Sequence, residues 1–96
     1  MTRVEFHPDA VAEARSAWQW YAERSPHAAS AFLAELDRAI TLVSEGPYQW
    51  PQYIAGTRRY ALRRFPFVLV YRERGDSVQI IAVAHGRRRP GYWRRR

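Results

Sequence analysis

Apolar residues change their spacing about halfway along this chain, and that change limits the fold to a small set of architectures. Up to residue 45, apolar residues recur at three- and four-residue steps, which is the spacing of one face of a helix. From residue 58 onward, three short runs are rich in β-branched and aromatic residues, as strands are. This order predicts an α+β fold: a short N-terminal strand, a helical hairpin, then an antiparallel β-meander with the helices packed on one sheet face.

Two helices are expected after a first strand at residues 3–6. Residues 7–9 open the first helix with an early proline and an acid in the first turn. Ser25 is the expected N-cap of the second helix and Pro26 its first residue, and the helix ends at Gly46. The first buried face is expected to hold Val11, Ala14, Trp18, Tyr21 and Ala22. The second is expected to hold Ala29, Phe32, Leu33, Leu36, Ile40 and Val43.

The second half predicts a loop followed by three strands. The loop spans residues 46–57, where no period survives, and it is expected to be anchored by Tyr48, Trp50 and Tyr53. The strands are predicted at residues 58–62, 65–72 and 78–84, with a hairpin turn at residues 74–77. No repeat, low-complexity segment or linker interrupts the chain, so residues 1–96 are predicted to form a single domain.

The composition favours a polyanionic partner. The formal net charge is +7, the sequence pI is about 10.8, and all 16 basic residues are arginine. Since a total lack of lysine is also typical of a GC-rich genome, the positions of the arginines carry more weight than their identity. There is no cysteine, no apolar stretch near the length that spans a bilayer, and no signal-peptide pattern. We therefore expect a soluble, cytoplasmic protein without membrane contact.

Several classes of chemistry are not expected. The five glycines are scattered, so there is no phosphate-binding loop and no nucleotide cofactor is expected. The three histidines lie far apart without a second ligand at metal-binding spacing, so no metal is expected either. Most carboxylates are predicted to lie on solvent-facing helix surfaces, which argues against a paired-carboxylate hydrolase. These are Glu13, Glu23, Glu35, Asp37 and Glu45.

The residues best suited to binding or catalysis lie near the C-terminus. An apolar run at residues 80–84 leads directly into HGRRRPGYW at residues 85–93 and three further arginines. A buried strand would hold this cationic and aromatic group in place, which suits binding or cleaving a phosphodiester. Metal-free RNA cleavage needs a proton acceptor, cations around the phosphate and a proton donor. Chemically capable residues here are His85, Arg87, Arg88 and Tyr92.

The predicted layout, with RRFPFVLVYR at residues 63–72 and AVAHGRRRPGYW at residues 82–93, resembles the RelE/ParE superfamily of type II toxins, the plasmid-stabilisation type. The likeness covers nearly the whole chain. It implies a cytoplasmic toxin encoded beside a cognate antitoxin. The acidic or amphipathic C-terminal segment of such an antitoxin wraps the toxin and blocks it, so a hetero-oligomer of the two proteins is expected.

The resemblance leaves the molecular target open between two branches. RelE-like members cut mRNA on the ribosome with a basic residue three positions before the strand tyrosine, but here Val68 precedes Tyr71 at that distance. Arg59 and Arg88 match the other basic positions, and Tyr92 lies near the place of a C-terminal catalytic tyrosine. ParE-like members lack the catalytic set and poison DNA gyrase, so Val68 favours gyrase as the target.

The alternative function is a ribosome-dependent mRNA endonuclease, in which His85, Arg88 and Tyr92 would be catalytic. A second alternative is an inactive toxin homologue or a nucleic-acid-binding module. Whether the chain is an enzyme depends on which branch applies, since a gyrase poison is not one.

Two sets of contact residues are expected. Target or phosphate binding is assigned to Arg59, Arg63, Arg64, Arg87 and Arg88. Antitoxin binding is assigned to Trp20, Tyr21, Arg63 and Trp93. Two alternatives remain open here: Arg63 and Arg64 are equally suited to guard a strand edge, and Trp93 is suited to cover the sheet.

Overall fold

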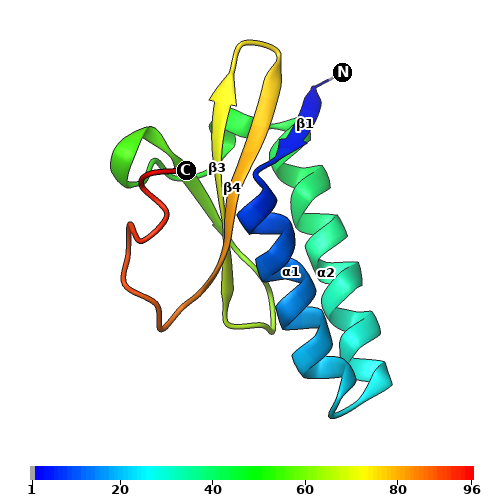
Figure 1. The fold of residues 1–96 in the computed structure, drawn as a ribbon. Coiled ribbons are helices and arrows are strands. Elements are labelled where there is room, and N and C mark those ends of the chain that lie inside the picture. Colours follow the sequence, from blue (N-terminus) through cyan, green and yellow to red (C-terminus); the bar gives the residue numbers. More distant parts are fainter. Residues whose placement is uncertain (1) are drawn as a thin grey trace.

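The computed structural model describes residues 2–96, which form a four-stranded sheet with two helices on one face (Figure 1). The elements in chain order are β1 (Arg3–Phe6), α1 (Pro8–Ala22), α2 (Pro26–Glu45), the 3₁₀ turns η1 (Pro47–Gln49) and η2 (Ile54–Gly56), β2 (Arg58–Ala61), β3 (Phe67–Arg74) and β4 (Ser77–His85). The strand order is β1-β4-β3-β2, with β1 parallel to β4 and the other pairs antiparallel. The predicted α+β architecture is confirmed, and β1 makes the sheet mixed.

Both helices begin where the sequence predicts. The Nδ1 atom of His7 accepts the backbone N–H of Asp9 at 3.1 Å, and Pro8 is the first helical residue of α1. The Ser25 hydroxyl accepts the N–H of Ala28 at 3.2 Å at the start of α2. Each side chain satisfies one of the backbone donors that a helix start leaves free.

The buried face of α1 differs from the prediction. Ala10 and Ala17 are buried, whereas Val11 and Trp18 are 40% and 39% exposed. Small residues toward the sheet let the helix lie close to it, and the larger side chains then flank the contact. Ala14 and Tyr21 pack against the core as predicted. The prediction was wrong for Val11 and Trp18, because it weighted large apolar residues and passed over Ala10 and Ala17, which have the same helical spacing.

The sheet is covered on both faces. Between the helices and the sheet lies a core of fully buried residues that includes Phe32, Leu69, Tyr71, Val78 and Ile80. On the other side Trp93 lies over the sheet at 1% exposure, and the segment after β4 runs back across that face (Figure 1). The residues of this second core are Val70, Ile81, Ala82, Ala84 and Trp93.

A β-bulge in β4 determines how the apolar run at residues 80–84 is divided between the two cores. Val70 pairs with Ala82 and Tyr71 with Ile80, so Ile81 is an extra residue in β4. An extra residue shifts the in-and-out alternation of a strand by one position. Ile80 therefore joins the core under the helices, whereas Ile81 and Ala82 both join the core under Trp93.

The turn between β2 and β3 is longer than predicted. Residues 63–66 form this turn, in which Arg64 has a φ of 68° and Pro66 has no N–H to donate to a neighbouring strand. As a result β2 ends at Ala61 and β3 begins at Phe67, two residues later than predicted. Arg63 and Arg64 therefore lie in the turn and not in either strand.

The loop at residues 46–57 is anchored by two of the three predicted aromatic residues. Trp50 packs edge-on against Tyr60 with ring centres 4.7 Å apart, and Tyr53 lies 5.8 Å from Trp93. Tyr48 is 65% exposed, so its predicted role as an anchor was wrong. Within residues 2–96, neither helix is long and apolar enough to cross a membrane.

Phe32 is expected to be critical for stability. Its ring is fully buried and touches Tyr21, Phe65 and Phe67 with ring centres 5.4–5.5 Å apart. We expect Phe32→Ala to lower the free energy of unfolding by about 3–5 kcal/mol, measured by urea denaturation, because it leaves a cavity. Leu33→Ala, on a side chain 43% exposed, should cost about 1 kcal/mol or less. Equal costs would contradict this packing.

Candidate functional site

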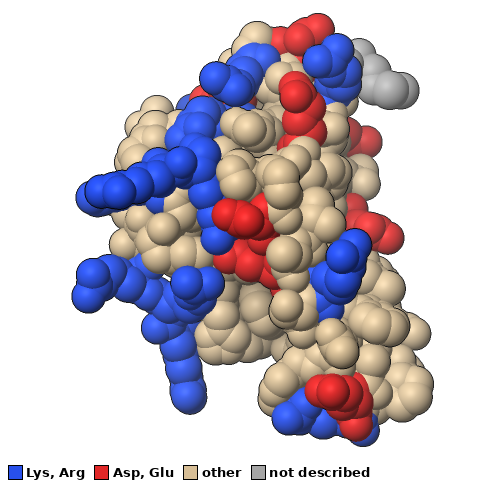
Figure 2. All heavy atoms as spheres, viewed as in Figure 1, with Lys and Arg blue, Asp and Glu red and all other residues tan. Residues whose placement is uncertain are grey.

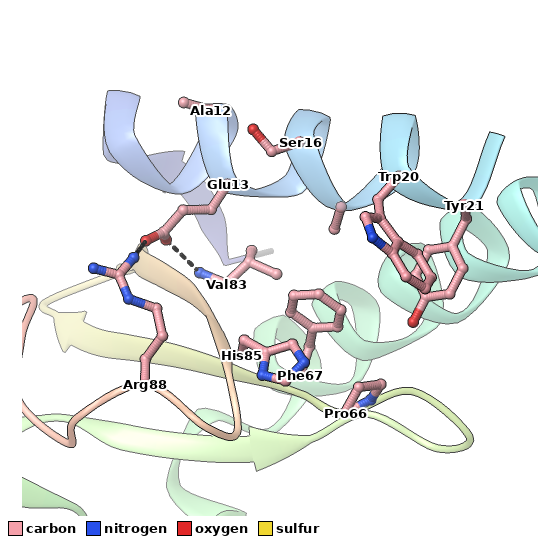
Figure 3. A pocket seen from close by; sticks show the side chains of 11 residues that line it. Ala12, Glu13, Ser16, Trp20, Tyr21, Pro66, Phe67, Val83, His85 and Arg88 are labelled. Carbon is pink, nitrogen blue, oxygen red and sulfur yellow. Dashed lines mark hydrogen bonds and ion pairs between the residues drawn. The ribbon is translucent and has the colours of Figure 1, made fainter. Parts of the chain in front are cut away.

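A cavity of about 530 Å³ opens between α1 and the part of β4 that extends beyond its pairing with β1. Its apolar wall includes Ala17, Trp20, Tyr21, Pro66, Phe67 and Val83. Its polar residues are Glu13, Ser16, His85 and Arg88. Figure 3 shows the two aromatic side chains of α1 toward one end, Glu13 and Arg88 toward the other, and Phe67 and His85 between them.

Glu13 is the most highly connected polar side chain of this region. Its carboxylate accepts the backbone N–H of Val83 at 3.0 Å, on the edge of β4 that β1 leaves open (Figure 3). It also accepts the hydroxyl of Tyr92 at 2.6 Å and both terminal nitrogens of Arg96 at 2.9 Å. Arg88 lies 3.5 Å from the same carboxylate. One acid on α1 therefore binds the strand edge and the chain end together.

These contacts hold Glu13 ionised. Burial raises the pKa of Glu13, but hydrogen bonds from Arg96, Tyr92 and the Val83 N–H outweigh it, so the pKa lies below its ordinary value. Burial, together with the hydrogen bond to Glu13, raises the pKa of Tyr92 well above its ordinary value of 10.0. Tyr92 is therefore a weak proton donor in this arrangement. Its ring is covered by the Arg88 guanidinium, 3.6 Å from the ring centre.

The C-terminal segment (residues 86–96) carries six arginines and no acid. It is ordered by successive turns, in which backbone N–H groups bond to carbonyls three residues earlier. Gly91 has a φ of 85°, and a side chain there would meet Ile54. Figure 2 shows basic side chains gathered on the side of the molecule where this segment lies.

A second acid holds the turn before β3. Glu35 on α2 accepts two hydrogen bonds from Arg38, at 2.9 and 3.1 Å, and the backbone N–H of Arg63 at 2.6 Å. Although burial raises the pKa of Glu35, its donors bring that pKa below the ordinary value. The prediction that Glu13 and Glu35 are solvent-facing was wrong: their side chains are only 15% and 11% exposed.

Comparisons with known proteins agree with this architecture. A family model described as the ParE toxin of the type II toxin-antitoxin system, parDE, matches residues 4–90. The chain belongs to the ParE toxin family. A solved structure of the chromosomal ParDE toxin-antitoxin system from P. aeruginosa matches with a TM-score of 0.77 and 20% sequence identity. The match covers 88% of this chain and 96% of that one, and it supports the ParE-like fold. A search of curated proteins finds no match.

The candidate residues of this ParE-family toxin fall in different places. His85 and Arg88 line the cavity, whereas Tyr92 reaches the same region only through Glu13. Arg59 lies on the edge strand β2, with its guanidinium 4.9 Å from the ring centre of Tyr53. The predicted phosphate-binding arginines therefore do not form one cluster.

The predicted antitoxin contacts also lie in different parts of the structure. Trp20 and Tyr21 line the cavity, and Trp20 is 51% exposed. Arg63 lies with an exposed side chain in the turn that ends at Pro66. Trp93 is buried against the sheet, which corrects its assignment as an antitoxin contact and agrees with the alternative that it covers the sheet.

Sequence reasoning missed Glu13, although two signals pointed to it. Asp9 and Glu13 are four residues apart on one helix, which places them on the same face. The C-terminal segment has no acid of its own to balance six arginines. The structure pairs these charges, because Arg96 contacts both acids.

Glu13→Gln tests this carboxylate. We expect the variant to lower the free energy of unfolding by about 2 kcal/mol at neutral pH, because Arg96 and Arg88 lose their counter-charge. Since the pKa of Glu13 is depressed in the folded chain, its stabilising effect is full above the ordinary value of 4.5 and declines as the pH falls through the folded pKa. The difference between variant and wild type should therefore shrink in acid.

Urea denaturation at several pH values measures this effect. The matched control is Glu23→Gln, whose side chain on the same helical hairpin is 66% exposed. That variant should change stability by less than about 0.5 kcal/mol. A pH-independent loss in Glu13→Gln would contradict a role for the charge.

Proposed function

We propose that this ParE-family toxin acts by binding DNA gyrase, and that a cognate antitoxin neutralises it by occupying the cavity beside α1. The family match supports the toxin-antitoxin context. The choice of target rests on the chemistry of the residues that an mRNA endonuclease would need.

The proposal rests on one observation: Glu13 binds two of the three candidate catalytic residues, Tyr92 by a hydrogen bond and Arg88 by an ion pair. Tyr92 donates its hydroxyl to Glu13, and the pKa of that hydroxyl is raised, mainly by burial. Arg88 is paired with the same carboxylate and lies over the tyrosine ring. A tyrosine held in this way is a poor proton donor for a leaving oxygen, so the arrangement favours binding over phosphodiester cleavage.

The position of His85 in the cavity supports a second candidate function, that of an mRNA endonuclease. Its Nδ1 atom accepts the backbone N–H of Arg87 at 3.1 Å, and its ring lines the cavity together with Arg88. A histidine beside an arginine suits proton transfer near a phosphate. Against this candidate, Val68 is half-buried in β3 and supplies no charge at the position where RelE-like toxins use a basic residue.

The cavity fits an antitoxin segment that is apolar with an acidic residue. Trp20, Tyr21 and Phe67 offer aromatic surface, and neighbouring apolar residues complete the wall. Arg88, with a side chain 53% exposed, and His85 lie at the polar end, where a carboxylate from a partner would meet them. Aromatic pockets with a charged rim are typical sites for an amphipathic segment that folds on binding.

Pulse labelling separates the two targets. The chain is induced from a tightly repressed promoter in a bacterial host, and DNA and protein synthesis are followed within minutes. We expect DNA synthesis to stop first, with DNA breaks accumulating, because a trapped gyrase complex blocks replication. Early collapse of protein synthesis would contradict the gyrase proposal and support the endonuclease. Normal growth with folded, soluble toxin would support an inactive homologue.

The antitoxin site is tested with a matched pair of tryptophans. We expect Trp20→Ala to weaken binding of the antitoxin encoded beside this toxin by about 30-fold, since aromatic anchors in a pocket contribute about 2 kcal/mol. Trp18→Ala is the control, because Trp18 is 39% exposed on the same helix and does not line the cavity. Calorimetric titration measures both. Equal losses, or no loss in either variant, would place the antitoxin elsewhere.

A further inference from the structure

Four arginines of the C-terminal segment are not bound by Glu13. Arg88 and Arg96 pair with Glu13, whereas the other four are exposed and, among residues 2–96, form no ion pair. These four, which we call the arginine array, are Arg87, Arg89, Arg94 and Arg95. The segment that carries the array lies on the side of the molecule where Figure 2 shows basic side chains gathered.

The backbone under the array is held in place. Trp93 is buried in the second core, and Arg96 is bound to Glu13 and to the Ile81 carbonyl at 3.1 Å. The array therefore lies on a backbone anchored at its end and by a tryptophan just before Arg94. Four like charges this close in sequence repel one another, and an anionic partner relieves that repulsion.

The surface of the segment favours phosphate over protein as the partner. Every exposed residue in it is arginine, glycine or proline, so it has no large apolar or aromatic side chain exposed to anchor a protein. Protein–DNA interfaces, in contrast, are polar and strongly positive, and arginine binds phosphate oxygens with a planar pair of donors.

The two aromatic residues of the segment are covered, and this favours duplex over single-stranded DNA as the ligand. Single-strand binders stack bases on exposed rings. Here Trp93 is 1% exposed, and the Tyr92 ring is covered by Arg88 at 3.6 Å with Arg96 at 5.2 Å. Neither ring is free to stack on a base. We infer that the arginine array binds the phosphate backbone of duplex DNA without reading its sequence.

Salt dependence of binding to a 20-bp duplex tests this inference with the purified chain alone. Four phosphate contacts give a slope of log affinity against log salt of about −3.6, or roughly a 100-fold loss between about 50 and 200 mM salt. Arg94→Gln/Arg95→Gln should reduce the slope to about −1.8. Arg87→Gln/Arg89→Gln should do the same, and it provides a second test if the first variant does not fold.

The control is Arg3→Gln/Arg15→Gln, which removes the same charge from β1 and α1 and should leave the slope nearly unchanged. An equal change in this control would overturn the inference, since net charge alone would then explain binding. So would absence of duplex binding at low salt, tighter binding to single strands, or binding of polyglutamate but not duplex through the array. Because no gyrase is present, the outcome is independent of the proposed target.

Discussion

Burial of β4 on both faces is the constraint that organises this fold. Its bulge sends Ile80 toward the helices and Ile81 and Ala82 toward the opposite face, so each face needs an apolar cover. The helical hairpin covers one face, and in a chain of 96 residues the loop before β2 and the C-terminal segment provide the other. An arginine-rich end is thus held in the fold by Trp93, although its composition alone resembles that of a free tail.

Glu13 pairs both a backbone group and a positive charge that this arrangement would otherwise leave without a partner. Beyond β1, the edge of β4 exposes backbone groups that need partners, and the returning segment brings positive charge toward the sheet. The carboxylate accepts the Val83 N–H and neutralises Arg96, which itself donates to the Ile81 carbonyl. Since buried polar groups are costly when unpaired, the strand edge and the chain end depend on the same few atoms.

Local signals in the sequence were sufficient for the order and type of the elements. Caps at His7 and Ser25, helical spacing and β-branched runs each act over a few residues. The bulge at Ile81, the positive φ of Arg64 and the contacts of Glu13 depend on residues far apart in the chain: Glu13 and Arg96 are 83 positions apart. Periodicity carries no record of such contacts, so it predicted the fold but not the role of Glu13, for which the charge balance between α1 and the C-terminal segment also had to be weighed.

The cavity and the arginine array differ in chemistry, yet both depend on Glu13. The cavity is aromatic and suits an amphipathic peptide, whereas the array has only guanidinium groups to offer and suits phosphates. Glu13 lines the cavity and also anchors the segment that carries the array. A change at Glu13 therefore affects both surfaces. Changes at Trp20 or at Arg94 and Arg95 each affect one, so these variants separate binding of a protein partner from binding of DNA.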